Sequence, residues 1–506
     1  SLRTEQALLI RPARRLADGT RYIVALRGIR DKSDALLGTS EAFSALRDDT
    51  PSDDPGVEAR RGHFETLFTT LGQAGVQRGG LQLAWDYTTA SKQSNTQWMV
   101  AARDDALGNF PDGVPYTVEV LTEGFGAETA CRLEITFEMP LYMDKGEAGG
   151  VLNFGADGLP AQNGTFPYLA AMTIPMSART APAPLVEYGH GQLGAKEEVV
   201  SGTWRRVANE LNLAMFALDF KGFAFDDVSA LVTVLASGDL SGFRTVPERL
   251  HQSMVNFLLA MRTLWRATEG GPETAFHKVL ANDCGGAMVD GSRRYWIGGS
   301  QGGILGATVM ALNTDIERGV LAVPGQPYNL LLNRSVNFDD FAPFFYGPFD
   351  WNGLDAQLGL ALIQGLWDRA EPSGYSPYIR TETFANTPSH EVLLLLSKSD
   401  KQVSNLAGHM MARSIGGVVN LAPTIRTVWG IPEVTGPHTG SAMLESDFGN
   451  PEAPLTNTPP WSDDGRDPHN RALEIGAMGT MMLEFLTTGT VENRCNGACD
   501  ADDITE

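Results

Sequence analysis

The chain has 506 residues, of which 42% are hydrophobic and 20% charged, so it carries enough apolar sequence for a folded globular protein. No run approaches the roughly 18 consecutive apolar residues of a membrane-spanning helix. With 39 basic and 61 acidic side chains the formal net charge is -22, which excludes nucleic acid and anionic membrane surfaces as bulk partners. Small molecules and neutral polymers remain as the expected classes of partner.

Residues 1–125 are predicted to form a β-rich accessory domain. Two short β-type runs flank the turn-forming pair Asp18-Gly19 and predict a hairpin. Ser40 can cap a helix whose apolar residues recur at helical spacing. The expected elements are a hairpin of strands over 7–12 and 21–26, a helix over 41–76, a strand over 81–87 and a linker or strand end over 88–95.

Between residues 126 and 490 short apolar runs alternate with amphipathic stretches, a pattern typical of a mostly parallel α/β sheet covered by helices on both faces. Residues 326–385 interrupt this alternation as an insertion, and 491–506 form a tail. The expected strands are 132–138, 168–174, 184–188, 213–220, 294–298, 319–323, 391–397 and 425–430, and the expected helices are 246–265, 304–312, 406–415 and 471–486.

Four cysteines are too few for a disulfide scaffold in a chain of this length. Cys495 and Cys499 flank an Asn-Gly turn, which favours a disulfide over two free thiols and an oxidising location: secreted, periplasmic or at the cell surface. Cys131 and Cys284 are candidates for a second bridge. Neither a metal nor a cofactor is expected, because no further thiol or imidazole lies close in sequence to complete a zinc site.

The segment Gly298-Gly299-Ser300-Gln301-Gly302 lies between a predicted strand and a helix of small residues. A strand that turns sharply into a helix forces the serine into strained backbone angles and leaves room only for small residues two positions before and after it. The pattern indicates a nucleophilic serine at the start of a helix. The alternative is a glycine-rich turn without chemistry.

Such a serine needs donors for an oxyanion and a histidine–carboxylate pair. The loop around His190 and Gly191 follows a predicted strand, so the backbone N–H groups of Gln192 and Gln301 are the expected donors and His190 is structural. An ordinary glycine loop is the alternative.

Asp400 comes three residues after a predicted strand and is the expected acid. A turn aspartate is the alternative. His469, directly before the closing helix, is the expected base, and His438 is the alternative base.

These motifs, in the order serine, acid, histidine, resemble the α/β-hydrolase family over residues 130–490, and within it secreted bacterial lipases and esterases with an N-terminal β-rich domain. The resemblance implies an eight-stranded, mostly parallel sheet with an inserted cap. Gly299 stands where lipases usually carry a histidine, which argues against long-chain triglyceride activity but not against ester hydrolysis.

The predicted cap is rich in aromatic residues, which fit either a wall over the serine or an ordinary hydrophobic core. They are Phe338, Phe341, Phe344, Phe345, Tyr346, Phe349 and Trp351.

The sequence therefore predicts a serine carboxylic-ester hydrolase, esterase- or lipase-like, that acts on apolar or aromatic esters through a covalent acyl-enzyme. Its substrate is expected to be a small-molecule, lipid or polymer ester, and the protein a monomer or weak oligomer. Two alternatives are an amidase or peptidase on the same fold, and a binding or adhesion protein with an inert hydrolase domain.

Overall fold

The computed structural model describes residues 7–121, 126–460 and 467–503, which fall into two compact units. The smaller unit is Leu16–Ser94, and the larger one takes in the described residues before and after it. In the described part no helix has both the length and the apolar character needed to cross a membrane.

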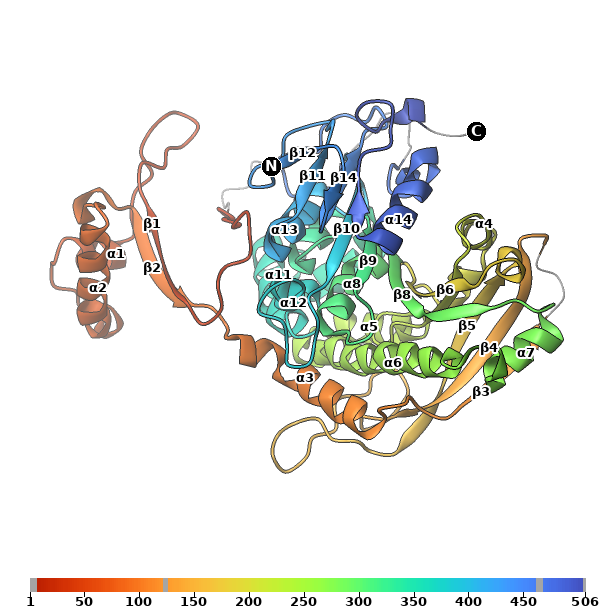
Figure 1. The fold of residues 1–506 in the computed structure, drawn as a ribbon. Helices are drawn as coiled ribbons and strands as arrows, with labels where there is room; N and C mark the ends of the chain where they lie inside the picture. The colour runs from red at the N-terminus through yellow and green to blue at the C-terminus, as the bar shows by residue number, and fades with distance from the viewer. Residues whose placement is uncertain (1–6, 122–125, 461–466, 504–506) are drawn as a thin grey trace. The chain divides into compact units, whose positions relative to one another are not determined.

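The smaller unit pairs strand β1 (Arg21–Leu26) antiparallel with β2 (Leu83–Thr88) and adds helices α1 (Glu41–Arg47) and α2 (Pro55–Gln73) (Figure 1). The helices bury Phe43, Leu67, Phe68 and Leu71 in a small core.

Three expectations for this unit differ from the structure. The partner of β1 is β2 rather than the run at 7–12, which forms no strand. The helix expected over 41–76 is two helices, because Asp54 caps a new helix that begins at Pro55. The unit also holds more helix than strand.

The structure also divides the chain earlier than residue 125. Helix α3 (Lys92–Asn109) enters the larger unit, where the buried Arg103 donates to the carbonyl of Leu312 and the hydroxyl of Thr387. Strand β3 (Tyr116–Leu121) then joins the main sheet.

The larger unit is built on an eleven-stranded sheet with the order β12-β11-β14-β10-β9-β8-β6-β7-β5-β4-β3. Neighbours from β12 to β7 are parallel, and β7, β5, β4 and β3 are joined antiparallel. The strands are β4 (Thr129–Pro140), β5 (Thr165–Pro175), β6 (Ala183–Gly189), β7 (Ala214–Leu218), β8 (Val289–Gly299), β9 (Arg318–Ala322), β10 (Glu391–Ser397), β11 (Val419–Ala422), β12 (Glu433–Thr435) and β14 (Ala442–Ser446).

The α/β prediction is thus confirmed, although the sheet has eleven strands where eight were expected. Seven of the expected strands are present, and four strands were not expected: β3 at one side of the sheet, and β14, β11 and β12 at the other. The strand expected over 425–430 is wrong. That segment is a loop in which Trp429 is 68% exposed and Gly430 has a φ of 76°, while β11 and β12 pair on either side of it.

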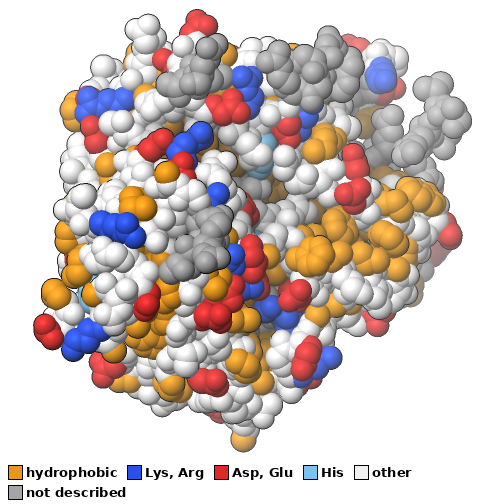
Figure 2. All heavy atoms as spheres, turned by 90° about the vertical axis from the view of Figure 1, so that its right-hand side faces the viewer, with side chains coloured by type: hydrophobic (Ala, Val, Ile, Leu, Met, Phe, Trp, Pro, Cys, Tyr) orange, Lys and Arg blue, Asp and Glu red, His pale blue; other side chains and the backbone are white. Residues whose placement is uncertain are grey.

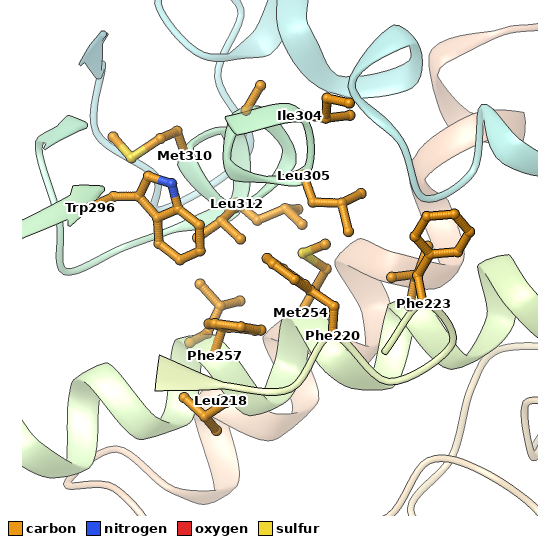
Figure 3. Packing of buried hydrophobic residues seen from close by; sticks show 14 of the residues in the cluster. Leu218, Phe220, Phe223, Met254, Phe257, Trp296, Ile304, Leu305, Met310 and Leu312 are labelled. Carbon is orange, nitrogen blue, oxygen red and sulfur yellow. The ribbon is translucent and has the colours of Figure 1, made fainter. Parts of the chain in front are cut away.

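Helices cover both faces of the sheet. One face packs under α4 (Gly202–Glu210) and α14 (Gly476–Thr488). The other carries the larger core, in which Phe220 stacks on Phe257 and Phe257 meets the ring of Trp296 edge to face (Figure 3). Its helices are α3, α5 (Val228–Ser237), α6 (Thr245–Thr268), α7 (Ala275–Asp283), α8 (Gln301–Leu312) and α13 (Asn405–Ile415).

The insertion between β9 and β10 is helical. It holds α9 (Tyr328–Leu331), α10 (Ala342–Tyr346), α11 (Gly353–Trp367) and α12 (Pro372–Tyr375). Phe338 and Phe345 are buried in its core, whereas Trp351 is exposed, so most of the predicted aromatic wall is packing.

Both candidate disulfides are present. Cys495 is bonded to Cys499, and Cys131 in β4 is bonded to Cys284 at the end of α7. The second bridge closes a loop with a sequence separation of 153 residues. It should therefore restrict the unfolded chain far more than the first, whose separation is 4.

We expect the double variant Cys131→Ala/Cys284→Ala to lose about 2–5 kcal/mol of unfolding free energy, because a long loop is released in the unfolded chain. Urea denaturation followed by circular dichroism measures this loss. The matched control, Cys495→Ala/Cys499→Ala, should lose clearly less. Equal losses in the two double variants would contradict the argument from loop length.

Candidate active site

Ser300 lies on a sharp turn between β8 and α8. Its φ of 56° and ψ of -119° are strained for a residue with a side chain, and its N–H donates to the carbonyl of Ala322 in β9. A Cβ on Gly302 would lie 1.9 Å from the carbonyl oxygen of Gly189, and a Cβ on Gly298 would lie 2.1 Å from that of Gly302. The two glycines are therefore required by the close approach of the backbone.

Asp400 and His469 form a buried pair at the carboxyl end of the sheet. The Nδ1 of His469 lies 2.7 Å from the Oδ2 of Asp400, and the side chains are 3% and 1% exposed. The N–H groups of Gln402 and Val403 donate to the other oxygen of Asp400 at 2.8 and 2.9 Å. The carboxylate is thereby held in place and keeps a proton on Nδ1.

The second nitrogen of this imidazole is free to act on a substrate. Nε2 of His469 is buried and has no hydrogen-bond partner among the described residues, and His469 lines the same pocket as Ser300. Burial lowers the pKa of His469, but the charge and hydrogen bond of Asp400 outweigh it and raise the pKa above its usual value.

The other late histidines lie elsewhere. His438 forms strand β13 (His438–Thr439), which pairs with β15 (Thr490–Val491). Its Nε2 and the Oε2 of Glu391, at the start of β10, would both lie within 4 Å of a Cβ on Gly440, whereas Asp400 follows the end of β10. His409, in α13, pairs with Glu445.

The loop after β6 is held by its own side chains. His190 is buried and accepts the N–H of Phe220 at Nε2 while Nδ1 donates to the carbonyl of Gly191, so its ring is fixed as a neutral structural group. Burial lowers its pKa. The carboxylate of Glu198 accepts the N–H of Gly191 and the hydroxyl of Tyr188.

The two expected oxyanion donors lie in the loop after β6 and at the start of α8. Gln192 lines the pocket beside Ser300, and Gln301 begins α8 directly after the serine. The side chain of Gln301 is turned to another use, because its Oε1 accepts the hydroxyl of Tyr328 in the insertion. Its backbone N–H remains the expected donor.

A chain of hydrogen bonds joins the loops around the pocket. The amide of Asn337, from the insertion, donates to the side-chain oxygens of Gln192 and Gln402 at 2.9 Å. Gln402 donates to Asp467, which also accepts the N–H of His469. The insertion is thus tied to the loops of the oxyanion donor, the acid and the base.

Sequence reasoning missed Asn337, Asp467 and Glu198, which arrange these loops. Asp467 stands two residues before His469, a spacing that favours a turn closed by a side chain. Asn337 lies in the middle of the aromatic insertion, and nothing in its sequence neighbourhood marks it.

The pocket has a volume of about 1140 Å³. It is lined by Ser300 and His469, by Gln192, Asn337 and Gln402, and by residues of α4 and α14. Figure 2 shows the side of the molecule that carries α4, hollowed near its centre, with hydrophobic and charged side chains on the surrounding surface. No group of three or more potential metal ligands occurs in the described residues.

No protein-family model and no curated protein matches this sequence. Several solved structures are distantly similar. An acetyl xylan esterase from Paenibacillus sp. R4 is 12% identical, with 68% of this chain and 90% of that chain covered and a TM-score of 0.38. Acetyl xylan esterase 1 from Thermoanaerobacterium sp. JW/SL YS485 is 13% identical, with 78% and 95% covered and a TM-score of 0.40.

An acylaminoacyl peptidase from Pyrococcus horikoshii is 12% identical, with 66% of this chain and 41% of that chain covered and a TM-score of 0.33. Likenesses this distant carry no argument about activity. The α/β-hydrolase fold of this chain rests on its own parallel sheet, on the strand–serine–helix turn, and on the positions of Asp400 and His469 after later strands.

Proposed function

We propose that the protein is a serine carboxylic-ester hydrolase with Ser300, His469 and Asp400 as its catalytic residues. The observation that carries this proposal is the buried His469–Asp400 pair, whose unpartnered Nε2 belongs to the pocket that Ser300 also lines. Such a pair orients one imidazole nitrogen toward a hydroxyl that must be deprotonated.

In the proposed reaction the Oγ of Ser300 attacks the ester carbonyl while Nε2 of His469 takes its proton. Asp400 holds the tautomer and stabilises the imidazolium, and the N–H groups of Gln192 and Gln301 stabilise the oxyanion. The protonated His469 then gives its proton to the departing alcohol. Water, deprotonated by the same histidine, releases the acid and regenerates Ser300.

The proposed substrates are apolar or aromatic esters of a small molecule, lipid or polymer. Phe341 from the insertion lines the pocket, and Gly299 leaves open space beside the serine. Two disulfides support an oxidising location, so we infer a secreted, periplasmic or surface enzyme.

One observation favours a peptidase as a second candidate. Asp340 also lines the pocket, and a carboxylate there could bind the free amino group of a peptide substrate. Hydrolysis of aminoacyl p-nitroanilides in preference to p-nitrophenyl esters would support this candidate.

Fluorophosphonate labelling tests the proposed function. The reagent should attach one group to Ser300, identified by peptide mass spectrometry, and the Ser300→Ala variant should remain unlabelled, because only an activated serine reacts. The wild-type protein should hydrolyse p-nitrophenyl esters of graded chain length. A label on another residue would overturn the assignment of Ser300. If the wild-type protein hydrolyses these esters no faster than Ser300→Ala, the proposed esterase activity is excluded.

A further inference from the structure

The pocket at Ser300 continues outward as a groove between α4 and α14. Its lining on the first side includes Val207 and Leu211, and on the second Met478 and Met482. Helix α4 follows the loop of Gln192, and α14 follows the loop of His469. The groove therefore begins where a bound ester carbonyl would lie.

The groove combines an apolar floor with a charged rim. Besides the residues above, Leu473 and Ile475 contribute apolar surface. Three of the charged lining residues, Arg206, Glu210 and Glu474, are exposed and reach water. Charged groups that stay hydrated leave the floor available for a group without charge.

The size of the cavity also favours a substrate with a long apolar group. At about 1140 Å³ it exceeds the roughly 300–1000 Å³ of sites that enclose drug-sized ligands. An acetyl ester at Ser300 would leave most of this volume empty of substrate. A substrate that fills it must extend well beyond the reacting carbonyl.

Gly479 lies where α14 approaches Leu211 at the end of α4. It is a lining residue of α14, and a Cβ built there would lie 3.5 Å from a methyl group of Leu211, which is ordinary contact. A small side chain would therefore be tolerated by the backbone, whereas a longer one would project into the space between the helices. A leucine at this position would therefore crowd Leu211 and reduce the space between the two helices.

We propose that the groove between α4 and α14 binds the hydrocarbon chain of the ester that reacts at Ser300. This inference rests on the proposed function and specifies its substrate class as esters that carry a long apolar chain. Each methylene that enters the groove is removed from water, which favours long chains over acetyl esters. The chain belongs either to the acid or to the alcohol of the ester.

Filling the groove with Gly479→Leu tests the proposal. The value of kcat/KM for p-nitrophenyl octanoate, octyl acetate or both should fall about 10-fold or more, because the leucine occupies space that the chain needs. The values for p-nitrophenyl acetate and ethyl acetate should stay within about twofold of wild type. A fall with the octanoate places the acyl chain in the groove, and a fall with octyl acetate places the alcohol there.

Two further variants make the test specific. Thr480→Leu adds similar bulk to the exposed side of α14 and should leave kcat/KM unchanged for all four esters. Val207→Phe narrows the groove from α4 and should repeat the effect of Gly479→Leu. If both groove variants hydrolyse acetyl esters and keep the wild-type ratio of octyl to acetyl ester hydrolysis, the groove does not bind the chain, while the proposed function still stands. A wild-type protein that hydrolyses none of these esters would instead overturn the proposed function.

Discussion

Replacing His469 by alanine is expected to lower kcat/KM for p-nitrophenyl esters by about 10⁴-fold or more, the scale seen when the histidine of a serine–histidine pair is removed. The variant lacks the nitrogen that takes the proton of Ser300 and later protonates the alcohol. Steady-state kinetics on wild type and variant measure the loss. Any residual rate would come from substrate binding and the oxyanion donors.

His438→Ala is the matched control, since it removes the same type of side chain at the position of the alternative base. His438 lies in β13 and pairs with β15 instead of facing Asp400. Its activity should stay within about twofold of wild type, as for a change outside the reacting centre. Circular dichroism should show that both variants are folded. A large loss in His438→Ala together with an active His469→Ala would reverse the assignment of the base.

The fold near Ser300 could be predicted from the sequence because its causes are local. Gly298 and Gly302 must lack side chains because a Cβ at either position would collide with a neighbouring backbone carbonyl. The continuous apolar run of β7 indicates a strand buried on both faces. These patterns need no knowledge of distant residues, so the central strands and α8 agree with the expectations.

The edges of the sheet were harder to predict because pairing there depends on tertiary context. The segment 425–430 contains Ile425, Val428 and Trp429, residue types that are common in strands, yet it is a loop between β11 and β12. Residues 7–12 also have strand composition, but β1 finds its partner more than fifty residues away, in β2. Composition alone does not say which of two available runs a strand joins.

The same distinction applies to the candidate site. Asp400 and His469 were identified from their order and their place after strands, and the structure brings them together. Asn337 contacts Gln192 and Gln402, which lie 145 and 65 residues away in the chain. A contact of this kind between three loops leaves no periodic trace in the sequence, so it could not be predicted.

Asp400→Asn is expected to reduce kcat by about 10⁴-fold, the loss that follows when the orienting carboxylate of such a triad becomes an amide. The oxygen of the asparagine would keep the N–H groups of Gln402 and Val403, which places its NH₂ against Nδ1 of His469. Nδ1 must then accept, the proton moves to Nε2, and the histidine can no longer take a proton from Ser300.

The same variant should also shift the pH dependence of kcat/KM. The base must be neutral, so activity rises with pH through the pKa of His469. In the wild-type protein burial lowers that pKa, but Asp400 raises it above the usual value. Without the carboxylate charge only the effect of burial and a weaker contribution from Asp467 remain, so the acidic limb should move to lower pH.

Asp467→Asn separates this effect from a general loss of charge. Asp467 also raises the pKa of His469, but it contributes less than Asp400, and it contacts the backbone N–H rather than the ring. We expect a smaller shift of the limb in the same direction and a loss of kcat below about 10-fold, since the tautomer is unaffected. Equal shifts and equal losses in the two variants would mean that Asp400 acts only through its charge and does not orient the imidazole.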